Sequence, residues 1–342
     1  MSEDVDISNT EQRKLDHIRI CLEEDVEFNK SNKFEEFSLD HNSAPEVDFN
    51  DISMNTSFLG NELDYPLYIT GITGGTDRAE RINKNLAEAA QNLGIGMGVG
   101  SQRAMIESSE LAYTYDVRDV APDIFLVGNL GLPQIIDGYG EEEVIRSVES
   151  INADALAIHL NPLQEVIQPN GDTDFKNGLS ALKELEDLNF PIIAKETGSG
   201  ISYEVGSELK ENGVDAINVA GAGGTSWSAV EYYRASYEKK RLAEKFWDWG
   251  IPTAYSVIEC SRVDLPLISS GGIRTGLEVA KSIAMGAELG GLALPLLEPA
   301  LEGPEEVQNK LNEIISELKV AMFLVGAENI EELKKVPVTI EE

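Results

Sequence analysis

Residues 159–169, HLNPLQEVIQP, bring together side chains that can bind polar groups and a metal ion. They follow the apolar run ALAI (155–158), so we expect a strand that leads into a loop. Asn161 and Gln164 carry amides that can bind polar substrate atoms, and Glu165 can hold a hard cation. Mg²⁺ usually takes one or two carboxylates together with phosphate oxygens, so a single carboxylate suits a substrate that brings its own oxygens.

The same stretch also has a purely structural interpretation. His159 would then be a core histidine, Pro162 would end the strand and Glu165 would begin a helix. The functional interpretation gains support from Lys195, which ends the apolar run PIIAKE (191–196). Burying a lysine at the end of an apolar strand is costly without a partner, and an anionic cofactor atom would satisfy it.

The elements that position these residues alternate between strand and helix patterns from residue 66 onward. The predicted strands are 66–72, 95–100, 124–129, 155–160, 191–196, 216–221, 265–271 and 289–295. Helical spacing is clear in 78–94 and 276–286. Eight such units in about 250 residues predict an α/β protein with a TIM (β/α)8 barrel. An open doubly wound sheet is the rival fold, and it usually has fewer strands.

The barrel is expected to occupy residues 65–342, with residues 1–64 as a helical and irregular N-terminal extension packed on it. Apolar positions 15, 18 and 22 recur at helical spacing, whereas 31–64 predict loops with one short strand. The long connection at about 222–264 predicts a helix pair or a lid.

Glycine-rich stretches follow several predicted strands, where backbone amides can approach an anion. They are GITGGT (71–76), AGAGGTSW (220–227), SSGGIRTG (269–276) and GLALP (291–295). The last two follow the seventh and eighth strands, where TIM barrels commonly bind a phosphate. A phosphate held there, with Lys195 across the barrel mouth, suggests FMN.

The overall charge is strongly acidic, with 27 basic against 61 acidic residues and a net charge of −34. Such a surface repels nucleic acid and anionic lipid, so neither is expected as a partner. It is consistent either with a salt-rich cytoplasm or with an ordinary acidic surface. A phosphate-binding pocket must nevertheless be neutral or positive, and the residues that can make it so are Arg13, Lys14, Arg103, Lys195 and Arg274.

The chain has only two cysteines, Cys21 and Cys260, which fits a reducing compartment. The N-terminus is acidic and polar and carries no signal-peptide pattern. No apolar run approaches the roughly 20 residues that span a bilayer. We therefore expect a cytoplasmic protein that does not insert into membranes.

Seven stretches together resemble the type 2 isopentenyl-diphosphate isomerases, the flavin-dependent form of that enzyme. They run in order over most of the chain, and HLNPLQE and GAGGTSW are the most distinctive. The matching stretches are RKLDHI (13–18), ITGGT (72–76), SQR (101–103), HLNPLQE (159–165), KETGSGIS (195–202), AGAGGTSW (220–227) and SGGIRTG (270–276).

The resemblance implies interconversion of isopentenyl and dimethylallyl diphosphate, a 1,3-allylic proton transfer in isoprenoid biosynthesis. It implies a TIM barrel that needs reduced FMN and Mg²⁺, with NADPH able to supply the electrons, and a homo-tetramer or homo-octamer. A side-chain acid strong enough for an unactivated alkene is hard to keep protonated near neutral pH, so we expect the flavin to be the principal acid and base.

By position, the resemblance implies a role for each matching residue. The substrate would contact Arg13, Lys14, Ser101, Gln102, Arg103, Asn161 and Gln164, with His159 near the diphosphate and Glu165 on Mg²⁺. FMN would contact Gly71, Ile72, Thr73, Gly74, Ser101, Asn129, Lys195, Thr225, Gly271, Gly272, Ile273, Ala293 and Leu294. The catalytic groups would be Gln164, Lys195 and His159. Ala220 is a departure, because the family often has serine there, so a hydrogen bond to the flavin is expected to be missing.

Two other functions remain open at this point. A 2-hydroxy-acid oxidase on the same barrel needs a histidine base late in the chain, and no histidine follows His159. A non-catalytic flavin-binding or diphosphate-binding protein is the second, and the intact polar set at 159–165 argues against it.

Overall fold

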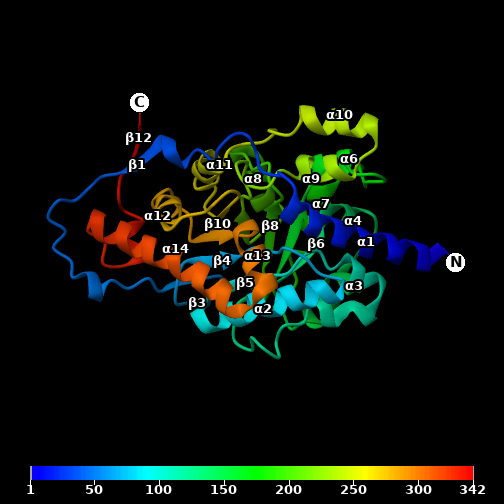
Figure 1. The fold of residues 1–342 in the computed structure, drawn as a ribbon, viewed down its shortest axis with the longest axis horizontal. Helices are drawn as coiled ribbons and strands as arrows, with labels where there is room; N and C mark the ends of the chain where they lie inside the picture. Colours follow the sequence, from blue (N-terminus) through cyan, green and yellow to red (C-terminus); the bar gives the residue numbers. More distant parts are fainter. Residues whose placement is uncertain (1, 342) are drawn as a thin grey trace.

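The computed structural model describes residues 2–341, with side chains from residue 12 onward. Eight parallel strands close into a barrel in chain order (Figure 1), and each lies within or beside its predicted range, so the predicted TIM barrel is confirmed. The strands are β4 (Leu67–Ile69), β5 (Gly96–Gly98), β6 (Leu126–Gly131), β7 (Ala155–Leu160), β8 (Ile192–Glu196), β9 (Ala216–Asn218), β10 (Leu267–Ser270) and β11 (Leu289–Leu292).

The inside of the barrel is filled by apolar side chains and is closed at its amino end by a hairpin. The hairpin consists of β2 (Thr56–Phe58) and β3 (Asn61–Leu63). Phe58 and Leu63 pack against the interior side chains, and Phe58 meets Phe125 edge to face at 5.8 Å between ring centroids. The barrel is therefore a packed core rather than a pore, and a ligand of the barrel is expected at the carboxyl ends of the strands.

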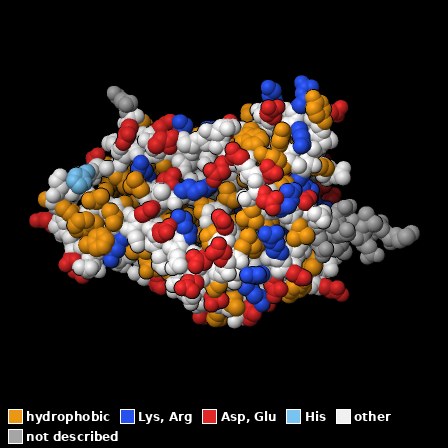
Figure 2. Space-filling model, viewed as in Figure 1, with side chains coloured by type: hydrophobic (Ala, Val, Ile, Leu, Met, Phe, Trp, Pro, Cys, Tyr) orange, Lys and Arg blue, Asp and Glu red, His pale blue; other side chains and the backbone are white. Residues whose placement is uncertain are grey.

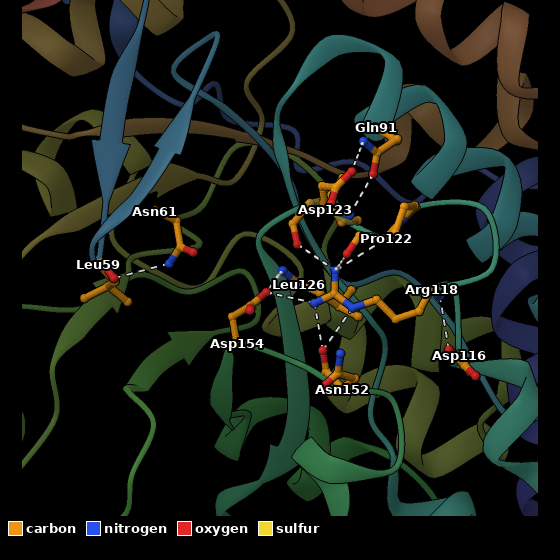
Figure 3. A network of polar contacts seen from close by, with 12 residues as sticks. Leu59, Asn61, Gln91, Asp116, Arg118, Pro122, Asp123, Leu126, Asn152 and Asp154 are labelled. Carbon is orange, nitrogen blue, oxygen red and sulfur yellow. Dashed lines mark hydrogen bonds and ion pairs between the residues drawn. The ribbon is translucent and has the colours of Figure 1, made fainter.

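Arg118 fastens the loops at the amino ends of β6 and β7 (Figure 3). Its guanidinium donates to the carbonyl oxygens of Ile124 at 2.9 Å and Asn152 at 2.7 Å, and pairs with Asp154 at 2.9 Å. The Asp154 carboxylate also accepts the amide of Leu126 at 2.8 Å. One side chain thus satisfies carbonyl groups that the loops leave without strand partners.

Helices surround the barrel, and several begin with side-chain caps. Thr76 caps α2, and Thr275 with Glu278 forms a capping box on α12. The α-helices after the extension are α2 (Asp77–Leu93), α3 (Arg103–Glu107), α4 (Leu132–Ile136), α5 (Glu141–Glu149), α6 (Pro162–Ile167), α7 (Gly178–Lys183), α8 (Tyr203–Glu211), α9 (Trp227–Arg234), α10 (Tyr237–Lys245), α11 (Thr253–Cys260), α12 (Gly276–Ala284), α13 (Leu294–Glu302), α14 (Pro304–Val325) and α15 (Ile330–Leu333). Short 3₁₀ turns span Phe34–Glu36, Phe49–Asp51 and Ser109–Thr114.

The first 64 residues form more structure than the sequence predicted. Helix α1 (Ser2–Glu23) contacts α3, α9 and α13. Three short strands follow it rather than one. Two of them are the hairpin strands β2 and β3, and the third, β1 (Phe37–Leu39), pairs antiparallel with β12 (Val338–Ile340). The β1 partner lies about 300 residues away, so no local pattern could reveal it.

The connection at 222–264 holds three helices, α9, α10 and α11, where a helix pair or lid was predicted. In Figure 2, α10 carries Lys and Arg side chains at the upper right of a surface on which acidic side chains are widespread. Among the described residues, no helix is both long and apolar enough to cross a bilayer.

Candidate functional site

A cavity of about 250 Å³ opens at the carboxyl ends of the barrel strands, the end at which TIM barrels carry their sites. One molecule of liquid water takes up about 30 Å³, so the cavity has room for a ligand of many atoms. The loops after the strands form most of the wall. Helix α1 adds a side, with Arg13, Lys14 and His17 among its contributions.

Nearly all residues predicted for the site line this cavity, although they come from segments far apart in the chain. The predicted residues in the wall are Arg13, Lys14, Gly71, Ile72, Thr73, Ser101, Arg103, Asn129, His159, Asn161, Gln164, Glu165, Lys195, Thr225, Gly271, Gly272, Ile273, Ala293 and Leu294. Arg274 and Ala220 lie there as well.

Gln102 and Gly74 are the two predicted site residues outside the cavity wall. Gln102 is fully buried, donates to the carbonyl oxygen of Ser147 at 2.7 Å and accepts the amide of Asn129 at 2.7 Å. It braces the wall rather than facing a ligand. Gly74 is required for packing, since a Cβ there would lie 1.9 Å from the Tyr115 ring.

The cavity is locally positive in a chain of net charge −34. Five of its lining residues are lysine or arginine, and Glu165 is the one carboxylate among the described lining residues. Burial and the charge of nearby Arg13 lower the pKa of the Lys14 ammonium to about 7. Burial lowers the pKa of Lys195 to about 8, against the attraction of Glu196. Both shifts come mainly from burial, and Arg13 adds repulsion at Lys14. Buried cations with little counter-charge favour the binding of an anion.

Lys14 is held in place by its neighbours. Its Nζ donates to the carbonyl oxygen of Ser101 at 2.8 Å and to the hydroxyl of Tyr115 at 2.7 Å. Tyr115 donates in turn to the Ser101 carbonyl at 2.8 Å. The SQR stretch and α1 are thereby joined at the mouth of the cavity.

Lys195 lies at the end of β8 beside a loop that its neighbour organises. Its Nζ donates to the carbonyl oxygen of Glu196 at 2.7 Å. The Glu196 carboxylate accepts the backbone amides of Thr197, Gly198 and Ser199, the first two at 2.5 Å. Burial raises the pKa of Glu196 to about 7, although these three amides favour its charged form.

The residues around Glu165 fit a hard cation. Glu165 is buried, and its Oε1 accepts a hydrogen bond from Asn161 Nδ2 at 2.8 Å. Asn161 is 3% exposed, and its Oδ1 has no hydrogen-bond partner. A carboxylate beside an unused amide oxygen is a ligand set that Mg²⁺ takes. The described residues contain no group of three or more His, Cys, Asp and Glu suited to a metal, so the remaining ligands would come from water and substrate.

His159 is held as a neutral imidazole. Asn129 donates its Nδ2 to the Val99 carbonyl at 3.1 Å, so its Oδ1 faces His159 Nδ1 at 2.8 Å and requires that nitrogen to be the donor. Burial, followed by the charges of Lys195, Lys14 and Arg13, lowers the pKa of His159 to about 3. This arrangement leaves Nε2 as an acceptor and makes His159 a poor source of protons at neutral pH.

The glycine loop after β10 and the start of α13 form a cradle for an anion. Gly271 and Gly272 have φ of 104° and 80°, and a Cβ on either would lie within 2.3 Å of a backbone oxygen of the 221–223 loop. Helix α13 begins in the cavity wall without a side-chain cap. Pro295 has no N–H and the Leu296 amide donates to the Ala293 carbonyl at 3.0 Å, so the Leu294 amide and the helix dipole are what favour a negative group here. Together with the glycine loop, this cradle fits the phosphate of FMN.

Several cavity residues escaped the sequence prediction, including His17, Gln134, Gln168 and Trp227. His17 meets Trp227 edge to face at 5.0 Å and contacts the buried Glu231 at 3.0 Å. His17 and Trp227 do stand in the stretches RKLDHI and AGAGGTSW, so those stretches carried a signal. Gln134 carried none, because it follows the third strand with no polar cluster around it.

Comparison with known proteins places the chain among isomerases. A relative from Thermococcus kodakarensis named isopentenyl-diphosphate delta-isomerase is 55% identical over 339 residues, covering 96% of this chain and 91% of that protein. Relatives of the same name from Archaeoglobus fulgidus and Methanocaldococcus jannaschii are each 50% identical over 335 residues, covering 97% and 95% of this chain and 96% and 93% of those proteins.

The barrel itself resembles those of flavoproteins. The family model for FMN-dependent dehydrogenases matches residues 179–339. A lactate oxidase of Pediococcus acidilactici superposes with a TM-score of 0.66 at 17% identity, over 91% of this chain and 86% of that one. A flavocytochrome b2 mutant with sulfite bound gives 0.67 at 17% identity, over 94% and 82%. Likeness at this identity shows the fold alone. Together with the identity to the archaeal relatives, these matches show that the chain belongs to the isopentenyl-diphosphate delta-isomerase family, in its FMN-dependent type 2 form.

Proposed function

We propose that this protein interconverts isopentenyl and dimethylallyl diphosphate by 1,3-allylic proton transfer, with FMN and Mg²⁺. The observation that carries the proposal is the placement of Glu165 and the cations of α1 in the same cavity as the glycine cradle after β10. The first group suits a metal-bound diphosphate and the second suits a flavin phosphate, so one cavity can hold both ligands side by side.

The diphosphate would lie between α1 and the SQR stretch. Arg13, Lys14 and Arg103 supply the positive charge there, with Ser101 beside them. Burial, and then repulsion from Arg103 and Arg234, lower the pKa of Arg13. A bound anion would reduce this repulsion between the arginines. Glu165 and Asn161 would hold Mg²⁺ against the diphosphate and neutralise part of its charge.

FMN, when bound, supplies proton-bearing ring nitrogens and an electron-rich face. Residues 71–73, Ser101, Asn129 and Thr225 would position it, and Gly271 to Ile273 with Ala293 and Leu294 would hold its phosphate. Lys195 would place positive charge near the ring and favour its anionic form by opposite charge. With both ligands bound, the cavity wall would limit the access of bulk water to an intermediate that resembles a carbocation.

Gln164 is proposed to orient the reacting group. Its Oε1 accepts from Asn161 Nδ2 at 3.1 Å, which leaves its amide hydrogens as donors toward the cavity. An amide is a poor base, so Gln164 positions or relays a proton rather than generating one. His159 would contribute its Nε2 as an acceptor for a donor beside the diphosphate.

Two finer parts of the proposal rest on the family resemblance. NADPH is the proposed reductant for FMN, and a homo-tetramer or homo-octamer is the proposed assembly. The cytoplasm is the proposed location, which agrees with the unpaired Cys21 and Cys260. The division into an extension at 1–64 and a barrel at 65–342 is likewise proposed.

A 2-hydroxy-acid oxidase is the rival function for a flavin barrel. That reaction needs a histidine base, and the histidines of this chain are His17, His41 and His159. His159 belongs to the set beside Glu165 and the diphosphate site. The identity of at least half to the archaeal isomerases also favours isomerisation.

Uptake of the flavin is the first test. Purified protein should carry FMN or take up added FMN in equal amount, seen as flavin absorbance that follows the protein through gel filtration. A colourless preparation that ignores added FMN would contradict the cofactor assignment. Oxidation of lactate or mandelate by the loaded protein would favour the rival function.

A further inference from the structure

We propose that Asp172 is a positioning residue that fixes Arg103 and Glu165 relative to each other and so couples diphosphate binding to Mg²⁺ binding. Asp172 does not line the cavity, but it contacts both of these lining residues. The proposal rests on the function proposed above and deepens it.

The loop after α6 folds back on the helix through the turn PNGD at 169–172. Asn170 adopts a left-handed φ of 57°, as asparagine tolerates. A Cβ on Gly171 would lie 1.9 Å from the Glu165 carbonyl oxygen, so only glycine allows so close an approach. The turn brings the Asp172 amide to Glu165 Oε2, to which it donates at 2.7 Å.

The side chain of Asp172 reaches the neighbouring part of the site, which follows β5 and β6. Its Oδ2 accepts from Arg103 Nη1 at 2.9 Å and from Gln134 Nε2 at 3.3 Å. Arg103 Nε donates to Glu107 at 2.7 Å. Two carboxylates therefore fix the guanidinium plane, and Nη2 keeps its donors, since no hydrogen bond from it is found within residues 12–341.

Stability alone does not explain this arrangement. The side chains of Arg103 and Asp172 are 31% and 44% exposed, and ion pairs this open contribute little to folding. Orientation is a better explanation, because a diphosphate gripped by arginine needs the guanidinium in one plane before binding. A shift of Asp172 would move both Arg103 and the carboxylate proposed for the metal.

Asp172 could instead compete with the diphosphate for Arg103, and this role predicts the opposite change in diphosphate affinity. If Asp172 only competed with the diphosphate for Arg103, its removal would tighten binding. The hydrogen bond to Glu165 argues for positioning, because competition for Arg103 would not need it.

The experiment first compares three variants loaded with oxidised FMN, by calorimetry with isopentenyl diphosphate and Mg²⁺. Asp172→Ala should weaken diphosphate binding and raise the half-saturating Mg²⁺ concentration, each about tenfold, the loss expected for one charge-assisted hydrogen bond. Both variants keep the backbone amide that donates to Glu165, but Asp172→Ala loses the side chain that ties the turn to Arg103 and Gln134. Asp172→Asn keeps an acceptor for Arg103, so it should stay within about threefold of wild type. Asp174→Asn is the matched control, because the bond found for the Asp174 side chain within residues 12–341 is the one it accepts from the amide of Lys176.

Steady-state kinetics with reduced FMN should show the loss in KM, with kcat changed by less than about threefold. Gly171→Ala keeps the Asp172 side chain but displaces its turn, and should reproduce the effect of Asp172→Ala. Unchanged or tighter binding by Asp172→Ala, in a wild type that isomerises normally, would overturn this proposal alone. A wild type that binds no isopentenyl diphosphate would overturn the proposed function itself.

Discussion

Asn161 donates a 2.8 Å hydrogen bond to Glu165 while its own Oδ1 stays buried and without a partner. A buried oxygen without a donor costs free energy, and a native protein keeps such a group where a ligand satisfies it. A cation between Asn161 Oδ1 and Glu165 would do so.

Glu165→Gln tests the metal role. Removing the charge should raise the half-saturating Mg²⁺ concentration at least about tenfold, because charge dominates the binding of a hard cation. Flavin absorbance should be retained, since the proposed FMN contacts lie elsewhere. Glu313→Gln, at an exposed position on α14, serves as the control. An unchanged Mg²⁺ dependence would remove Glu165 from the metal site.

Lys14 should make diphosphate binding depend on pH. With its pKa at about 7 in the empty site, Lys14 is mostly neutral at pH 8, whereas a bound diphosphate favours the ammonium. Binding at pH 8 should therefore take up nearly one proton and weaken as pH rises above 7. Calorimetry in buffers of different ionisation enthalpy measures the uptake. Lys14→Met should abolish it, and uptake that persists in this variant would assign the proton elsewhere.

Ala220→Ser should strengthen FMN binding. Ala220 lines the cavity at a φ of 35°, in the position where the family often has serine. Alanine and serine share the same backbone cost there, so the hydroxyl is the main change. One added hydrogen bond predicts an FMN dissociation constant about threefold to tenfold lower, measured by flavin fluorescence quenching. An equal or weaker affinity would mean that the hydroxyl does not reach the flavin.

Arg118→Met should destabilise the barrel without touching the site. The Arg118 side chain is 15% exposed and serves carbonyls at the amino end of the barrel, opposite the cavity. Its loss should lower the free energy of unfolding by about 2–4 kcal/mol in urea titrations. Turnover at low temperature should stay at the wild-type level. The conservative variant Arg118→Lys should retain only part of the stability, because one ammonium cannot reach all of these oxygens.

The sequence was sufficient for the parts of the fold with a local signal. All eight barrel strands are apolar runs that alternate with helices, and the polar stretch at 159–165 stands at the end of one of them. Pairing of β1 with β12 has no such signal, because residues 37 and 340 meet only in three dimensions.

Side-chain direction was the other limit. Gln102 stands between Ser101 and Arg103, which both face the cavity, yet its amide turns inward to Ser147 and Asn129. Asp172 is the opposite case, a residue outside the cavity wall that contacts a site residue. Its sequence PNGD predicts a turn, but its contact with Arg103 depends on how the barrel brings the two loops together. Spacing along the chain brings a residue near a site, and packing decides which way it points.

The most direct measurement of the central claim is an anaerobic assay with isopentenyl diphosphate, Mg²⁺ and reduced FMN, each omitted in turn. Proton NMR follows the vinylic hydrogens of the substrate and the methyl groups of the product. Dimethylallyl diphosphate should form in the complete mixture only, with no net oxidation of the flavin. Conversion without FMN, or none in the complete mixture, would contradict it.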